Sequence, residues 1–336
     1  MRALECIAPG QLRLTQRPMP EPAPGELLLR VRRVGLCGTD FHIFSGDQPF
    51  VSYPRIMGHE LAGEVVATRG SAEFASGDRV CVMPYRSCGA CVACRSGKSN
   101  CCANIAVLGV HTDGALAEYL CVPEKLALKA DELELDALAM VEFLAIGRHA
   151  VQRACVETGQ RILVVGAGPI GMGAALFAQR AGAQVTVVDM RAARLALCGR
   201  SLNVAHTLAP SEDLESELAA ISNGEFFDVV FDATGHRAAM QRGFRFVAHG
   251  GSYVLLSIVK GDITFDDSEF HKRETTLLAS RNATRADFQA VLAAMKEGAV
   301  PLAALNTHRT SLEALPDHMP NWIAPDSGII KALIEL

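Results

Sequence analysis

Four residues between positions 35 and 60 have side chains that can bind a metal ion or move a proton. They are Cys37, His42, His59 and Glu60, in the sequences G-L-C-G-T-D-F-H and M-G-H-E. A thiolate and an imidazole suit Zn²⁺, which prefers tetrahedral coordination by sulfur, nitrogen and oxygen. A catalytic zinc keeps one position open for water or substrate, so three protein ligands are expected. Cys37 and His59 would be two of them.

The third ligand has two candidates in the sequence. Glu60 follows His59 directly, and Glu142 lies in the apolar run A-L-A-M-V-E-F-L-A-I-G. An acidic side chain among apolar neighbours is costly to bury unless it is paired or bound to a metal. The alternative interpretation needs no metal, because a buried cysteine and a hydrogen-bonded histidine also occur in small β-rich domains.

A second set of candidate ligands lies in the segment C-G-A-C-V-A-C-R-S-G-K-S-N-C-C. Cys88, Cys91 and Cys94 are three residues apart, and Cys102 follows eight residues later. Four thiolates on so short a loop can close around one tetrahedral ion, which leaves no open position and predicts a structural zinc. Cys101 is adjacent to Cys102 and could replace it. The remaining cysteines are expected to be small buried hydrophobes: Cys6, Cys81, Cys121, Cys155 and Cys198.

A dinucleotide-binding fingerprint begins after the buried-strand run Arg161–Val165. The sequence G-A-G-P-I-G places glycines at Gly166, Gly168 and Gly171, ahead of an alanine-rich helix. Such glycines allow a tight turn and a close approach to the pyrophosphate, which binds at the helix N-terminus. The next strand ends at Asp189, about 20 residues further on, where a carboxylate can accept from the ribose 2′-hydroxyl. The pattern predicts NAD as a cofactor.

The coarse element pattern predicts an α/β fold. Short strands are expected within residues 26–33, 58–66, 78–83 and 106–123, and a helical stretch within residues 133–158. From residue 161 onward, strands and helices alternate, and strands at 161–165, 184–188, 204–208, 227–235, 251–258 and 275–280 would complete a doubly wound sheet of six. After Ser280 a helix, a loop and a final strand are expected.

The composition excludes several classes of protein. A chain of 336 residues predicts two domains, and 49% hydrophobic with 21% charged residues is typical of a globular protein with a sizeable core. The net charge of −5, from 32 basic and 37 acidic residues, does not indicate a nucleic-acid partner. No apolar run reaches the length of a membrane span, and the first residues lack a signal-peptide pattern. We therefore expect a cytoplasmic protein whose clustered cysteines bind metal.

These motifs together resemble those of the zinc-containing medium-chain dehydrogenase/reductases along essentially the whole chain. The matching motifs are G-L-C-G-T-D-F-H, G-H-E, the four-cysteine segment, D-G-A-L-A-E-Y, V-E-F-L and V-V-G-A-G-P-I-G. Within that family the chain is similar to the polyol and sugar-acid branch of sorbitol, L-idonate and L-galactonate dehydrogenases. The segment S-E-F-H-K-R-E-T-T-L-L-A-S-R-N-A-T is especially similar to that branch.

The resemblance implies a domain arrangement. Residues 1–146 and 284–336 would form a GroES-like catalytic domain, residues 147–283 a Rossmann NAD-binding domain, and the active site would lie in the cleft. Relatives assemble as homodimers or homotetramers, and the partner of the site would be a small-molecule substrate. Phe143 stands where the family often has proline, directly after Glu142.

The resemblance also implies roles for individual residues of the catalytic domain. Cys37, His59 and a glutamate would hold the catalytic zinc. Glu142 matches the position of a second cysteine in alcohol dehydrogenases, and Glu60 is the neighbouring ligand in related enzymes. Thr39 would accept the substrate proton, and His42 would pass it to solvent. Ile170, Asp189 and Arg194 match NAD contacts of the family.

Three residues of the Rossmann segment indicate the substrate. Lys260 and Arg281 follow the fifth and sixth strands, at the edge where ligands bind. The planar fork of Arg281 can bind a carboxylate with two hydrogen bonds, and Asn282 can bond sugar hydroxyls. Arg281 also matches a substrate-side arginine of the family. We therefore expect NAD-dependent oxidation of a secondary hydroxyl on a six-carbon sugar acid, such as L-galactonate or L-idonate.

Four other functions fit the sequence less well. A neutral-polyol dehydrogenase of the sorbitol type and a threonine 3-dehydrogenase would share most of these motifs. A zinc-free quinone or enoyl reductase would not need Cys37, His59 and the four-cysteine segment. A non-catalytic NAD-binding sensor would keep the fingerprint without turnover.

Overall fold

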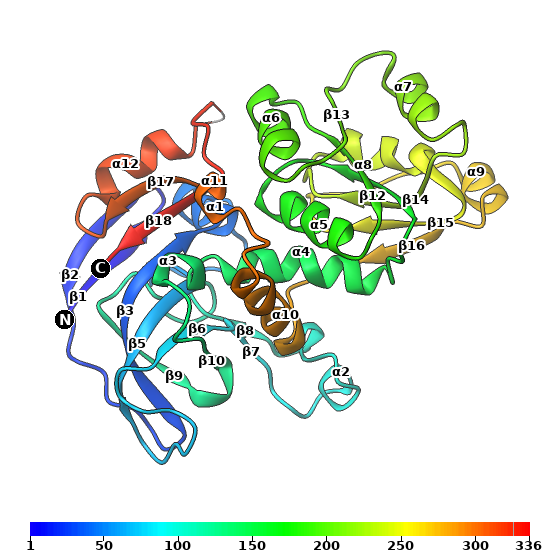
Figure 1. Ribbon diagram of the computed structural model, residues 1–336. Helices are drawn as coiled ribbons and strands as arrows, with labels where there is room; N and C mark the ends of the chain where they lie inside the picture. Colours follow the sequence, from blue (N-terminus) through cyan, green and yellow to red (C-terminus); the bar gives the residue numbers. More distant parts are fainter. Residues whose placement is uncertain (325) are drawn as a thin grey trace. The chain divides into compact units, whose positions relative to one another are not determined.

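The computed structural model describes residues 1–324 and 326–336 of the chain. The chain divides into two compact units, Met1–Phe143 with Thr284–Leu336, and Leu144–Ala283. In Figure 1 the first unit is blue to cyan at its start and orange to red at its end, and both chain termini lie on it. The predicted α/β fold class is confirmed, because one unit is β-rich and the other holds six parallel strands.

The first unit is built mainly from strands. Its strands are β1 (Arg2–Ala8), β2 (Gln11–Gln16), β3 (Glu26–Leu36), β4 (Arg55–Ile56), β5 (Glu60–Thr68), β6 (Arg79–Val82), β7 (Tyr85–Arg86), β8 (Ala106–Val107), β9 (Tyr119–Pro123), β10 (Ala127–Lys129), β17 (Asn306–Ser311) and β18 (Lys331–Glu335). Its helices are α1 (Gly38–Ser45), α2 (Val92–Arg95), α3 (Leu135–Leu138), α10 (Arg285–Lys296), α11 (Leu302–Leu305) and α12 (Leu315–Trp322).

The main sheet of this unit joins the two ends of the chain. Its strand order is β10-β6-β5-β3-β18-β17, with β9 also paired to β3. The apolar residues of β3 explain its central place, since Leu27, Leu29 and Val34 are fully buried. The C-terminal strand β18 pairs antiparallel with β3, so that Ala332 lies opposite Leu36. Figure 1 shows the red β18 beside the blue β3, although most of the sequence separates them.

The second unit is a doubly wound sheet. Its strands are β11 (Arg161–Val165), β12 (Gln184–Val188), β13 (His206–Leu208), β14 (Phe227–Asp232), β15 (Val247–Leu255) and β16 (Thr276–Ala279). Its helices are α5 (Pro169–Arg180), α6 (Ala192–Ser201), α7 (Leu214–Ile221), α8 (Arg237–Gly243) and α9 (Asp267–Lys272), while α4 (Val141–Arg153) begins in the first unit. The strand order is β13-β12-β11-β14-β15-β16, and every pairing is parallel.

The turn after β11 depends on close backbone packing. Gly166 adopts a φ of 99°, a left-handed conformation that favours glycine. A Cβ atom on Gly171 would lie 1.9 Å from the Gly166 carbonyl oxygen, so α5 packs on this turn only because residue 171 is glycine. Gly168 caps α5 in an extended conformation, and Pro169 occupies the first helical position, where proline is favoured.

Some local predictions were wrong. The helical stretch at residues 133–158 is two helices, α3 and α4, and the second ends at Arg153. Cys155, expected to be buried, is exposed and has a φ of 53° just after α4. The loop expected before the final strand contains α11, β17 and α12. The polar sequence N-T-H-R-T-S and the prolines of α12 concealed the last two, because β17 gains its order from pairing with β18.

We predict different outcomes for two glycine-to-alanine substitutions in this turn. Gly171→Ala should lower the melting temperature of the protein and destabilise it by about 1–3 kcal/mol, because the backbone must shift to admit the methyl group. Gly168→Ala is the matched control, since its Cβ would meet nothing closer than Arg194 Nη1 at 3.7 Å. Equal thermal stability of the two variants would contradict the packing account.

Candidate catalytic zinc centre and cofactor site

The pairing of β3 with β5 brings the candidate zinc ligands together. Cys37 follows the last residue of β3 and caps the N-terminus of α1. His59 immediately precedes β5, and Glu60 is the first residue of that strand. Gly35 of β3 is directly opposite Glu60 in the antiparallel register. The register therefore places Cys37 and His59 at the same end of the sheet.

Three ligand types meet at this point. One sulfur of Cys37, one ring nitrogen of His59 and one carboxylate oxygen of Glu60 lie within 4.8 Å of one another. His59 and Glu60 are buried, and His59 Nδ1 has no hydrogen-bond partner among the described residues. A buried imidazole nitrogen without a partner, next to a thiol and a carboxylate, fits a zinc ion.

Asp40 ties the two ligand segments together. Its buried carboxylate accepts hydrogen bonds from the backbone N–H of Cys37 at 2.9 Å and of Gly58 at 3.0 Å. The same carboxylate lies 3.9 Å from His59 Nδ1. Burial alone would lower the pKa of His59, but the negative charges of Asp40, Cys37 and Glu142 raise it well above its usual value. The surroundings of His59 therefore favour a positive charge at this point.

Glu60 has a buried positive partner. Lys331 Nζ, at the start of β18, lies 2.6 Å from both carboxylate oxygens of Glu60 and donates to the Leu36 carbonyl at 3.0 Å. The ammonium also lies 4.5 Å from the ring centroid of Phe143, within the range of a cation–π interaction. Gly35 is required here, because a Cβ atom would lie 2.4 Å from Glu60 Oε2.

Glu142, in the first turn of α4, is the other candidate glutamate. It is 3% exposed, and the hydroxyl of the buried Tyr85 donates to its Oε1. Its Oε2 has no hydrogen-bond partner among the described residues. Burial raises the pKa of Glu142 to about 7, a shift that the charge of His59 opposes. Glu142 thus interacts with the same charged centre. Glu60, however, is the glutamate whose carboxylate oxygen lies within 4.8 Å of the ligand atoms of Cys37 and His59.

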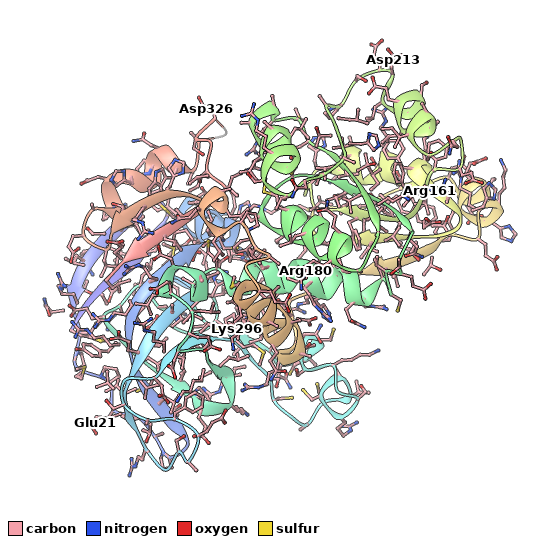
Figure 2. All side chains as sticks on the ribbon, viewed as in Figure 1. Glu21, Arg161, Arg180, Asp213, Lys296 and Asp326 are labelled. Carbon is pink, nitrogen blue, oxygen red and sulfur yellow. The ribbon has the colours of Figure 1, made fainter. Side chains whose placement is uncertain are left out.

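The four-cysteine segment forms a second cluster. One sulfur from each of Cys88, Cys91, Cys94 and Cys102 lies within 4.8 Å of the others, and Cys102, not Cys101, belongs to this group. The backbone N–H groups of Ala103 and Cys94 lower the pKa of Cys91 to about 6, whereas burial raises that of Cys94 to about 11. Four sulfurs at such spacing fit a closed tetrahedral zinc site. Figure 2 draws sulfur in yellow, and several sulfur atoms gather in the lobe around α2.

Thr39 and His42 lie on one face of α1. They are three residues apart, so their side chains are neighbours on the helix surface. Thr39 is half-buried and His42 is exposed. This arrangement suits transfer of a proton from the interior toward solvent.

The cofactor fingerprint residues lie at the carboxyl ends of β11 and β12. Asp189 directly follows β12, and its two carboxylate oxygens accept from the backbone N–H groups of Ala167 and Arg191, both at 2.7 Å. The carboxylate is thereby fixed beside the glycine turn. Arg194 lies near Gly168, and burial, together with the charge of Arg191, lowers its pKa. Ile170 is half-buried in the first turn of α5.

The candidate substrate residues follow β15 and β16 in the second unit. These two strands are adjacent and parallel. Lys260 comes after β15 and Arg281 after β16, and both side chains are exposed. Asn282 has a φ of 55°, in the left-handed region that asparagine tolerates better than most residues.

Three residues of the zinc centre were missed by the sequence interpretation. Asp40 stands in the motif around Cys37, and its position three residues after a helix cap was an available signal. Tyr85 and Lys331 gave no such signal, because their partners Glu142 and Glu60 are far away in the sequence.

Comparison with known proteins identifies the family. The alcohol dehydrogenase GroES-like domain matches residues 23–132, and the zinc-binding dehydrogenase domain matches residues 169–297. The chain is 42% identical to L-galactonate-5-dehydrogenase of Escherichia coli K12 over 335 residues, covering 99% of this chain and 98% of that protein. The chain belongs to the zinc-containing medium-chain dehydrogenase/reductases.

Two further similar proteins extend the comparison. An L-threonine 3-dehydrogenase of Saccharopolyspora erythraea is 36% identical over 270 residues, which cover 77% of each chain. A protein of Escherichia coli CFT073 described as a short chain alcohol dehydrogenase, solved as a complex with NADH, superposes with a TM-score of 0.93 at 28% identity, covering 100% of this chain and 99% of that one. The chain is therefore an oxidoreductase of this family with a small-molecule substrate.

Among the described residues, no helix combines the length and apolarity needed to cross a membrane.

We predict two zinc ions per chain in carefully purified protein, one for each ligand group. Cys91→Ser should lose one ion and lower the melting temperature, because it removes one of four thiolates from the closed site. Metal analysis by mass spectrometry checks the count. Wild-type protein with a single zinc per chain would contradict the assignment of two sites.

We predict that Lys331→Met destabilises the metal-free protein by about 3–5 kcal/mol, because it leaves the buried Glu60 carboxylate without its partner. The double variant Lys331→Met with Glu60→Gln should regain most of that stability, since both charges are then removed. Urea unfolding measures both. If Lys331→Met alone is as stable as wild type, the ion pair contributes nothing to the free energy of unfolding.

Proposed function

We propose that this protein is an NAD-dependent zinc dehydrogenase that oxidises a secondary hydroxyl of a six-carbon sugar acid resembling L-galactonate or L-idonate. The observation that carries the proposal is the 42% identity to an L-galactonate-5-dehydrogenase across nearly the whole of both chains. The two metal-ligand groups and the fingerprint turn supply the parts that such a reaction needs.

The catalytic zinc would be held by Cys37 and His59 with Glu60 or Glu142. Bound there, zinc supplies a Lewis acid that makes a substrate hydroxyl more acidic. Asp40 holds the Cys37 and His59 segments in fixed positions through its two backbone hydrogen bonds. Lys331 neutralises Glu60, so a substrate meets a site with fewer uncompensated negative charges.

Thr39 and His42 would move the proton that the hydroxyl loses. Thr39 is half-buried, and its hydroxyl would accept the proton. His42 is one helical turn further along α1 and is exposed, so its imidazole would pass the proton to solvent.

The second unit would orient the nicotinamide cofactor. The glycine turn and the N-terminus of α5 would bind the pyrophosphate, with Ile170 and Arg194 beside it. Asp189 is held by two backbone N–H groups and would accept from the adenosine ribose. Arg281 and Lys260 would bind the substrate carboxylate, and Asn282 a sugar hydroxyl.

The setting of the enzyme is part of the proposal. All eleven cysteines are free, which suits a reducing cytoplasm. We expect a homodimer or homotetramer, as the family resemblance implies.

The second candidate is a threonine 3-dehydrogenase, favoured by the 36% identity to such an enzyme. A panel of hexonates, hexitols and L-threonine with NAD⁺, followed by absorbance of the reduced cofactor, separates the two. Turnover of L-threonine above that of any hexonate would replace the sugar-acid proposal.

We predict a preference for NAD⁺ over NADP⁺ of about 10–100-fold in kcat/KM, the range for one charged hydrogen bond. Asp189 would repel a 2′-phosphate and lose its hydroxyl partner. Asp189→Asn should narrow the preference, because it removes the repulsion but keeps an acceptor. Equal kcat/KM for the two cofactors in wild type would contradict this role of Asp189.

We predict that Arg281→Ala weakens kcat/KM on a hexonate by about 1.5–3 kcal/mol, the range for hydrogen bonds to a charged group. The corresponding hexitol, which has no carboxylate, should change less. Lys260→Ala, measured on the same two substrates, tests whether the lysine also binds the carboxylate. If wild type prefers the hexitol, the protein is a neutral-polyol dehydrogenase and the sugar-acid proposal fails.

A further inference from the structure

Tyr85 connects the two candidate metal sites of the first unit. Its hydroxyl donates to Glu142 Oε1 at the catalytic centre, and Cys88 of the four-cysteine cluster follows three residues later. None of the roles assigned so far uses this tyrosine. Because Tyr85 is 4% exposed and Glu142 is 3% exposed, their hydrogen bond is shielded from water.

The hydrogen bond leaves one carboxylate oxygen of Glu142 uncommitted. Oε1 accepts from Tyr85, while Oε2 is buried and lacks a partner among the residues described. An ionised carboxylate with one satisfied oxygen cannot rotate without breaking that bond. Oε2 is therefore the oxygen available to a cation or to a water that the cation orients.

The backbone around Tyr85 closes the base of the four-cysteine lobe. Strand β7, Tyr85–Arg86, pairs with β8, Ala106–Val107, and Tyr85 lies opposite Val107. All four clustered cysteines lie between these two strands. A metal ion that crosslinks this loop would hold the short two-residue pairing together, and with it the backbone of Tyr85.

The ring of Tyr85 is fixed from a second direction. Phe288 of α10 is fully buried and meets the tyrosine ring edge-on, with centroids 6.4 Å apart. Arg285 anchors the start of α10 by donating to the carbonyls of Lys125 and Ala127 at 2.8 and 3.1 Å. Lys296, labelled in Figure 2, pairs with Glu132 at the other end of the helix.

We propose that Tyr85 is a positioning residue that aims the Glu142 carboxylate at the catalytic zinc, and that the four-cysteine lobe keeps Tyr85 in place. The inference rests on the zinc centre of the proposed function. It gives the lobe a role in catalysis besides stability, because loss of the structural ion would loosen β7 and release Glu142. Hydrogen-bond partners of metal ligands typically affect metal affinity by about 10–100-fold.

The test measures zinc retained by the whole protein against increasing concentrations of a competing chelator. Each ion should be released at its own chelator concentration. The ion whose release shifts in the Glu142→Gln variant is the one at the catalytic centre. Tyr85→Phe, which removes only the hydroxyl, should weaken the retention of that same zinc ion by about 10–100-fold. Tyr253→Phe is the matched control, since Tyr253 is a buried tyrosine whose hydroxyl donates to the Met240 carbonyl at 2.8 Å, in the other unit. It should retain both ions as wild type does.

A second arm tests the lobe. Cys94→Ser should weaken retention of the catalytic ion in the wild-type background and have little further effect in the Tyr85→Phe background, because the two changes act through one contact. Equal weakening in both backgrounds would overturn the role of the lobe. If Tyr85→Phe behaves like Tyr253→Phe while Glu142→Gln weakens retention, Tyr85 does not position Glu142. If Glu142→Gln itself changes nothing, Glu142 takes no part in holding the ion and the role proposed for Tyr85 fails, while a centre of Cys37, His59 and Glu60 would stand.

Discussion

The buried ion pair between Lys331 and Glu60 joins the last strand of the chain to the zinc centre. Both side chains are at most 1% exposed, and the ammonium lies 2.6 Å from each carboxylate oxygen. A buried carboxylate without a partner is strongly destabilising, so β18 must return to β3 before this centre can be stable. The constraint explains why the C-terminal segment belongs to the same unit as β3, although the whole parallel-sheet unit lies between the two in the sequence.

The same constraint governs the other buried acids. Asp40, Glu60 and Glu142 surround Cys37 and His59, and Asp40 is satisfied by two backbone N–H groups. Glu142 receives one hydrogen bond, and burial raises its pKa to about 7. Burial favours the protonated form of a carboxyl group. A bound dication has the opposite effect, because it favours the ionised carboxylate and the thiolate. The negative charge gathered at the centre is thus both a cost to the metal-free protein and the source of its affinity for zinc.

A sequence can predict which residues lie together where short spacing determines geometry. The four cysteines, the residues around Cys37 and His59, and the glycine turn after β11 each act within a few residues of one another. The six parallel strands were also predicted, because the inner strands β11, β12 and β14 are nearly continuous buried apolar runs. By contrast, Tyr85 and Lys331 meet their partners through strand register and helix packing over long separations, which no local pattern records. Strand β17 was missed for the same reason, since its polar residues are ordered by β18.

X-ray absorption at the zinc edge of the wild-type protein tests the central claim most directly. Two different zinc sites predict a first shell of sulfur at about 2.3 Å and of nitrogen or oxygen at about 2.0–2.1 Å. One site with four thiolates and one with a single thiolate give an average of about 2.5 sulfurs per zinc. A shell of sulfur alone would contradict the mixed centre at Cys37, His59 and a glutamate. A shell without sulfur would contradict both sites.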